Sequence, residues 1–161
     1  VFLTMCIFCR IAAEELPASI VYEDPYAVAF LDIQPITPGH VLVIPKRHAE
    51  NFIDLPSEDA SHLMRVGQMI DAALRRSDLR CDAVAMFLAD GRAAGQDVNH
   101  VHLHVFPRYA GDGFNFTFDH SAGAEPAERP GYQGTCLSKN RSSAAIKKKR
   151  LSQSAETTSS F

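Results

Sequence analysis

Three histidines of this 161-residue chain, His100, His102 and His104, alternate with apolar residues in the segment His-Val-His-Leu-His-Val. Successive side chains of an extended strand point to opposite faces. The pattern therefore predicts a strand over residues 99–107 with all three imidazoles on one face. A row of imidazoles contributes little to apolar packing, so we interpret it as a functional site.

Two kinds of chemistry could use this row of histidines. Alternating histidines can bind a metal ion together. Alternatively, one imidazole nitrogen can attack phosphorus when a hydrogen bond to its other nitrogen fixes the tautomer, while neighbouring histidines donate protons. The preceding loop, residues 91–96, contains Gly91 and Gly95 and could offer backbone N–H groups to an anion.

A second candidate for chemistry is the Cys6-x-x-Cys9 pair. Residues 1–5 contain no basic residue, and Cys6, Cys9 and Arg10 interrupt the apolar stretch. No secretory signal is therefore predicted, and we expect a cytoplasmic, reducing location. There the pair is typical of a metal site or a redox pair, and free thiols are the alternative. A closed zinc site would need two further ligands.

Hydrophobic periodicity and turn residues predict the elements that must position these side chains. They are a helical turn from Cys6 to Leu16, a hairpin of residues 19–23 and 26–31, strands over 40–45 and 83–88, and a helix over 57–76. Ser57 is the predicted N-cap of the long helix. This order favours an α+β fold, with a mostly antiparallel sheet of about five strands, one long helix and a short N-terminal helix.

Charge is distributed unevenly along the chain. Residues 1–118 hold 15 acids and 9 bases, whereas residues 119–161 hold 4 acids and 7 bases and few large apolar side chains. We predict one folded domain over 1–118 and a disordered, low-complexity basic tail over 119–161. The net charge of −3 and the lack of a long apolar run argue against a specific nucleic-acid binder and a membrane protein.

The histidine row resembles the signature of the histidine triad (HIT) family, and other segments extend the resemblance over about residues 5–114. They are Thr-Pro-Gly-His-Val-Leu-Val-Ile-Pro-Lys-Arg-His at 37–48, Gly-Gln at 95–96 and Pro-Arg-Tyr at 107–109. The resemblance implies the HIT-like fold, with the sheet and helices described above. The Cys-x-x-Cys pair makes the chain similar to the zinc-bearing, Hint-like and bacterial HIT branches.

The resemblance also implies an activity. His102 would attack the α-phosphorus of a purine nucleotide conjugate, either a phosphoramidate or a dinucleoside polyphosphate. Water would resolve the nucleotidyl-histidine intermediate and release a nucleoside monophosphate, with no metal required for the chemistry. The other implied catalytic positions are His104, His40 and His100. The nucleotide-binding candidates are Asp32, Gln96, Asp97, Val98, Phe8, Phe30 and Ile33, of which the last three are predicted walls of a base pocket.

The same resemblance implies a homodimer and a structural zinc held by Cys6, Cys9, His48 and His100. Two positions depart from the family pattern. Ala89 stands where Asn or Gln is common, and Asp97 stands where Ser or Thr is common. These departures motivate an alternative, a nucleotide-binding regulator or scaffold with negligible turnover. A third possibility is a metallohydrolase that uses the triad itself as metal ligands.

Overall fold

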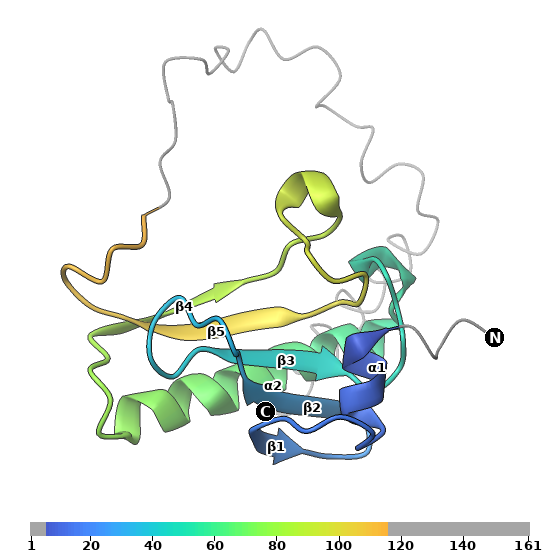
Figure 1. The fold of residues 1–161 in the computed structure, drawn as a ribbon, viewed down its shortest axis with the longest axis horizontal. Coiled ribbons are helices and arrows are strands. Elements are labelled where there is room, and N and C mark those ends of the chain that lie inside the picture. The colour runs from blue at the N-terminus through green and yellow to red at the C-terminus, as the bar shows by residue number, and fades with distance from the viewer. Residues whose placement is uncertain (1–5, 116–161) are drawn as a thin grey trace, which may run out of the picture. The chain divides into compact units, whose positions relative to one another are not determined.

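A computed structural model describes residues 6–115, which form one five-stranded antiparallel sheet with a helix on each face (Figure 1). The elements are α1 (Ile7–Ala12), β1 (Ile20–Glu23), β2 (Ala27–Leu31), β3 (Val41–Pro45), η1 (Phe52–Asp54), α2 (Ser57–Arg76), β4 (Ala83–Phe87), η2 (Arg92–Ala94) and β5 (Leu103–Arg108). The strand order is β1-β2-β3-β5-β4, so β3 and β5 are central neighbours. The predicted α+β fold is confirmed.

The two faces of the sheet carry two separate apolar clusters. Under α2, the buried cluster includes Val43, Leu63, Val66 and Leu103. On the opposite face, Phe8 of α1 packs into a smaller cluster; its other buried members are Val28, Phe30, Leu42 and Ile44. Because β2 and β3 are covered on both sides, nearly all of their residues are buried. The face under α1 is also the face that carries the histidines.

The long helix α2 spans residues 57–76, as predicted, but its N-cap is not the predicted Ser57. Pro56 occupies the N-cap, and Ser57 already lies within the helix without capping it through its side chain. Glu58 and Asp59 lie in the first turn, where the helix dipole favours negative charge. At Gly67 the helix lies so close to the sheet that an added Cβ would be 2.8 Å from Leu103 Cδ2.

The predicted strand over residues 99–107 is shorter than expected, because β5 begins only at Leu103. Upstream of it, the His100 N–H bonds to the Val98 carbonyl and the Val101 N–H bonds to the Ala49 carbonyl. These bonds replace the regular strand ladder. The predicted alternation still holds, since Val101, Leu103 and Val105 are all buried in the cluster under α2.

The predicted tail, residues 119–161, lies outside the described residues, so its prediction stays open. Within residues 6–115, no helix is both long enough and apolar enough to cross a membrane.

Candidate active site and metal centre

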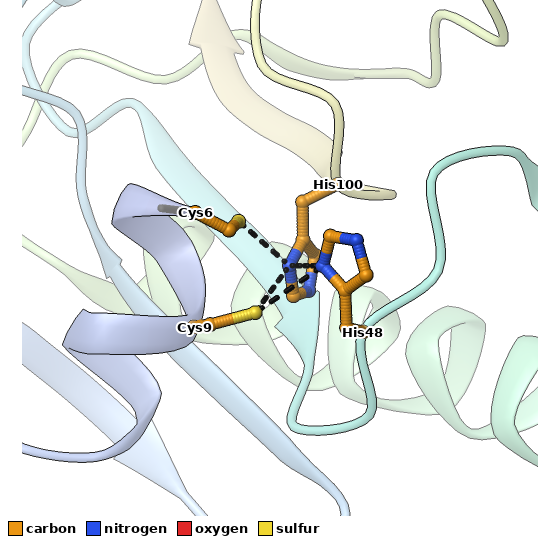
Figure 2. Close-up of side chains that lie close together, drawn as sticks. All are labelled: Cys6, Cys9, His48 and His100. Carbon is orange, nitrogen blue, oxygen red and sulfur yellow. Dashed lines mark hydrogen bonds between the residues drawn. The ribbon is translucent and has the colours of Figure 1, made fainter. Parts of the chain in front are cut away.

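Four side chains from three distant segments meet at one end of the sheet (Figure 2). Cys6 and Cys9 come from the start of α1, His48 follows β3, and His100 precedes β5. Their ligand atoms all lie within 4.8 Å of one another. The structure thus brings together the four residues proposed as a metal site, including two separated by 94 positions in the chain.

The spacing of these atoms fits tetrahedral zinc. Zinc–sulfur bonds of about 2.3 Å and zinc–nitrogen bonds of about 2.0 Å place sulfur and nitrogen about 3.5 Å apart and two nitrogens about 3.3 Å apart. His100 Nδ1 lies 3.4 Å from Cys6 Sγ and 3.5 Å from Cys9 Sγ. His48 Nδ1 lies 3.2 Å from Cys9 Sγ and 3.3 Å from His100 Nδ1. The donor set, two thiols and two imidazoles, is also one that zinc prefers.

The protonation states of this cluster also suit the binding of a metal ion. Nε2–H of His100 donates to the Pro45 carbonyl at 2.9 Å, which leaves Nδ1 unprotonated and available to a metal. Burial lowers the pKa of His100 to about 4, which keeps the imidazole neutral. Burial and the neighbouring Cys6 raise the pKa of the Cys9 thiol to about 11, so a bound cation is what would ionise it.

His102 is held in one tautomer by the backbone. Its Nδ1 lies 2.7 Å from the carbonyl oxygen of His100, which can only accept, so the proton resides on Nδ1. Nε2 is then the nitrogen with a free lone pair, as a nucleophile requires. The ring is buried, with only 4% of its surface exposed, and the edge of Phe8 packs against it with centroids 5.4 Å apart.

A second pair of imidazoles lies beside His102. Nδ1 of His40 accepts a hydrogen bond from the Ile36 N–H at 3.2 Å, so its proton is on Nε2. That Nε2–H donates to Nδ1 of His104 at 2.9 Å, which leaves Nε2–H of His104 available to a substrate oxygen. The His102 and His104 rings are 4.8 Å apart between centroids. A chain of hydrogen bonds therefore sets which nitrogen of each ring can donate.

Burial keeps this pair neutral. Burial, together with the neighbouring rings of His102 and His40, lowers the pKa of His104 to about 4, against the opposing charges of Asp32 and Asp97. Burial lowers the pKa of His40 as well, although Asp32 Oδ2 lies 3.4 Å from its Nδ1. Because both imidazoles are uncharged, the N–H of His40 can donate to His104, and the N–H of His104 stays available to a phosphate oxygen.

Asp32, His40 and His104 also lie close enough together to be considered as metal ligands. Their contacts differ from those of the cysteine cluster, because His40 and His104 face each other across a hydrogen bond of 2.9 Å. Both nitrogens of His40 already have partners, since Nδ1 accepts from Ile36. This arrangement favours a chain of hydrogen bonds that fixes the tautomers of the two histidines over a metal site.

The loop before the triad is fastened by Gln96. Its buried side chain accepts a hydrogen bond from the Gly91 N–H at 2.6 Å and donates to the Glu50 carbonyl at 2.8 Å. Gln96 therefore shapes the predicted phosphate loop through contacts within the protein. Asp97 is exposed, and Val98 packs partly buried against the cluster beside α1.

The three predicted base-pocket residues have different environments. Phe8 and Phe30 are buried and in edge contact, with centroids 5.5 Å apart, whereas Ile33 is 93% exposed next to Asp32. Asp32 itself is partly buried and accepts a hydrogen bond from the Gln34 N–H. Within the described part of the chain, Ile33 is thus an apolar side chain that lies almost fully exposed at this edge of the site.

The backbone groups that order the imidazoles, which are the Pro45 and His100 carbonyls and the Ile36 N–H, were not predicted from the sequence. No sequence signal marks them, because every residue carries such groups. His62 is half-buried, and its Nε2 lies 2.6 Å from Asp24 Oδ2.

Comparison with known proteins places this geometry in a family. Residues 13–111 match the model of the HIT domain. An uncharacterized HIT-like protein of Methanocaldococcus jannaschii is 45% identical over 109 residues, which cover 68% of this chain and 83% of the relative. The adenosine 5'-monophosphoramidase of Saccharomyces cerevisiae is 37% identical over 103 residues, covering 64% of this chain and 62% of that enzyme.

Among solved structures, a zinc-bound histidine triad family protein from Mycobacterium smegmatis superposes with a TM-score of 0.68. It is 43% identical and covers 73% of this chain and 85% of its own. The chain belongs to the HIT family, and its fold is the HIT-like fold that sequence analysis predicted. The cluster of Cys6, Cys9, His48 and His100 is compatible with a structural zinc.

Proposed function

We propose that this protein is a nucleotide hydrolase or nucleotidyl transferase that attacks the α-phosphorus of a purine nucleotide conjugate through His102. The observation that carries the proposal is the 2.7 Å hydrogen bond from His102 Nδ1 to the His100 carbonyl, which leaves Nε2 as a buried, unprotonated nitrogen. The similarity to a yeast adenosine 5'-monophosphoramidase supports a nucleotide substrate.

In the first step, Nε2 of His102 forms a bond to phosphorus while the bond from phosphorus to the leaving group breaks. Water then attacks phosphorus, the nitrogen–phosphorus bond breaks, and a nucleoside monophosphate is released. Over the full cycle one water molecule is consumed. One of its hydrogens ends on the leaving group, and its hydroxyl ends on phosphorus. His102 returns to its starting tautomer because the His100 carbonyl holds its Nδ1 proton throughout.

The neighbouring groups stabilise charge and position the substrate. Nε2–H of His104 donates to a phosphate oxygen, because His40 occupies its Nδ1. The Asp32 carboxylate accepts hydrogen bonds from the ribose hydroxyls, and Phe8, Phe30 and Ile33 provide apolar surface for the base. Gln96, Asp97 and Val98 border the phosphates.

In this proposal the protein also belongs to the zinc-bearing, Hint-like branch. Cys6, Cys9, His48 and His100 hold one zinc ion, which supplies a structural cross-link and takes no part in bond breaking.

We further propose a cytoplasmic homodimer. β4 is an outer strand of the sheet, and it carries Met86, whose side chain is 37% exposed beside Gly67 of α2. A strand at the edge of the sheet that carries apolar side chains supports pairing with a second copy. A solution mass equal to one chain would contradict it.

The activity is tested with the full chain and two substrates, adenosine 5'-phosphoramidate and diadenosine tetraphosphate, by measuring AMP release. His102→Ala is expected to lower the rate by roughly a thousandfold or more, because the nucleophile is lost. His62→Ala is the matched control, a histidine outside the site, and should retain the rate. An undiminished rate for His102→Ala would refute the mechanism.

A second candidate, a nucleotide-binding regulator with negligible turnover, is favoured by one observation. The exposed Asp97 carboxylate acts electrostatically on His104, where it would oppose an anionic phosphate. Ala89, the other departure from the family pattern, is buried and offers no polar group. Tight AMP binding by calorimetry, with no product from either substrate, would favour this candidate over the enzyme.

A further inference from the structure

His100 takes part in two different sites, one through its imidazole and the other through its backbone carbonyl. Its imidazole, fully buried, presents Nδ1 to Cys6, Cys9 and His48. Its carbonyl oxygen accepts the Nδ1 proton of His102. One residue thus connects the cysteine cluster to the nucleophile.

The backbone of His100 is not held by the sheet. β5 pairs with β3 only from Leu103 onward, in the register Val43 to Leu103. Upstream, the backbone bonds are those from His100 to Val98 and from Val101 to Ala49. The Val101 N–H belongs to the same peptide group as the His100 carbonyl, so its bond to Ala49 holds one side of that group. The anchoring of the His100 side chain is the second restraint on the direction of the carbonyl.

That anchoring is incomplete without a metal. The Nε2–H bond to Pro45 fixes one edge of the ring. On the other edge, the partners of Nδ1 within residues 6–115 are the thiols of Cys6 and Cys9 and an imidazole nitrogen of His48, at 3.3 to 3.5 Å. Thiols are weak hydrogen-bond donors, so a bound cation would restrain this edge far more strongly than the unmetallated cluster does.

A second connection runs through α1. Phe8 lies between the two cysteines in sequence, and its ring contacts both His100 and His102, with centroids 6.0 and 5.4 Å apart. Anchoring Cys6 and Cys9 therefore also presses Phe8 against the nucleophile's ring.

We propose that His100 is a positioning residue through which occupancy of the Cys6–Cys9–His48–His100 cluster sets the orientation and tautomer of His102. Loss of the metal would lower kcat, because His102 would no longer present a single tautomer to the phosphorus. The inference rests on the proposed function for its kinetic consequence and not for its structural one.

The test compares the full-length wild type, the double variant Cys6→Ser, Cys9→Ser, and Cys81→Ser as matched control. Cys81 donates a hydrogen bond to the Ala83 carbonyl and is not one of the four residues of the cluster. Zinc content and the nitrogen-15 NMR spectrum of His102, which distinguishes Nδ1–H from Nε2–H, are measured at neutral pH. The double variant should lose zinc and show a mixture of His102 tautomers, while Cys81→Ser should resemble the wild type.

For phosphoramidate hydrolysis, the double variant should lower kcat roughly ten- to a hundredfold, in line with groups that orient a site indirectly. If the double variant does not fold, wild-type protein is stripped with a chelator, checked by circular dichroism, and reloaded with cobalt. The cobalt–thiolate absorption then reports loading independently of activity.

A folded, metal-free protein with a single Nδ1–H tautomer at His102 would overturn the inference, whatever its activity. If no form of the protein turns over substrate but the His102 tautomer still follows metal loading, the proposed function would be refuted and the positioning role would remain supported.

Discussion

Nε2 of His40, just before β3, donates a hydrogen bond of 2.9 Å to Nδ1 of His104 on β5. The bond is possible because β3 and β5 are adjacent and antiparallel, with Leu42 opposite His104. It is the last link of a chain that begins at the Ile36 N–H and ends at the His104 Nε2–H. The donor offered to a substrate thus depends on a backbone group 68 positions earlier in the sequence.

His40→Phe should test this chain. The substitution removes the donor to His104 and keeps a ring in the buried position, so His104 loses its fixed tautomer. We expect kcat for AMP release to fall up to about tenfold, the equivalent of one hydrogen bond. The matched control is His62→Phe, a histidine that also lies beside a carboxylate but outside the site. Equal rates for His40→Phe and wild type would contradict the ordering role.

His48→Ala should remove the metal. Purified wild-type protein is expected to contain about one zinc per chain, as four donors in tetrahedral spacing imply. The variant leaves three ligands, so zinc content and melting temperature should both fall, as measured by metal analysis and calorimetry. Wild-type protein purified under reducing conditions without stoichiometric zinc would contradict the metal site.

Gln96→Leu should loosen the loop over residues 91–96. The variant loses the bonds to the Gly91 N–H and the Glu50 carbonyl, and it leaves both groups without those partners. We expect faster amide hydrogen exchange within the loop and weaker AMP binding by calorimetry, by about 1–3 kcal/mol. Gln68→Leu, on the exposed surface of α2, is the control. Unchanged exchange in residues 91–96 would show that Gln96 does not hold the loop.

Asp24→Asn should change the pH dependence of stability. Burial alone would raise the pKa of Asp24, but hydrogen bonds from the Tyr26 and Ala27 N–H groups, Tyr22 and His62 lower it from 3.8 to about 2. Because the folded pKa lies below the unfolded value, the carboxylate stabilises the fold above pH 3.8. That contribution is lost as pH falls toward 2.

At pH 7, the variant should therefore unfold at lower urea concentration, with a loss of about 1–2 kcal/mol, and the difference from wild type should shrink between pH 4 and pH 2. Subtracting the two curves cancels other acid-sensitive groups, including the cysteine cluster. Asp78→Asn, an exposed aspartate, should match the wild type. A difference that stays constant down to pH 2 would contradict the assignment.

Local patterns were sufficient to predict much of the fold. Period-two alternation placed Val101, Leu103 and Val105 in the core and the histidines on the opposite face, and helical periodicity located α2 over residues 57–76. These patterns succeed because side-chain direction follows from the backbone geometry of each element. The patterns failed where a residue bonds to a segment far away in the sequence. The Val101 N–H bonds to the Ala49 carbonyl, and this bond delays the start of β5.

The sequence by itself determined which side chains are available for chemistry: a row of imidazoles, a pair of thiols, and the motifs that assign the chain to its family. Only the tertiary structure decided how they are used. The Pro45 carbonyl directs one nitrogen of His100 toward the cysteines, and the His100 carbonyl frees one nitrogen of His102 for attack. An imidazole has two equivalent-looking nitrogens, and the partner that distinguishes them is here a backbone group positioned by packing between segments far apart in the chain.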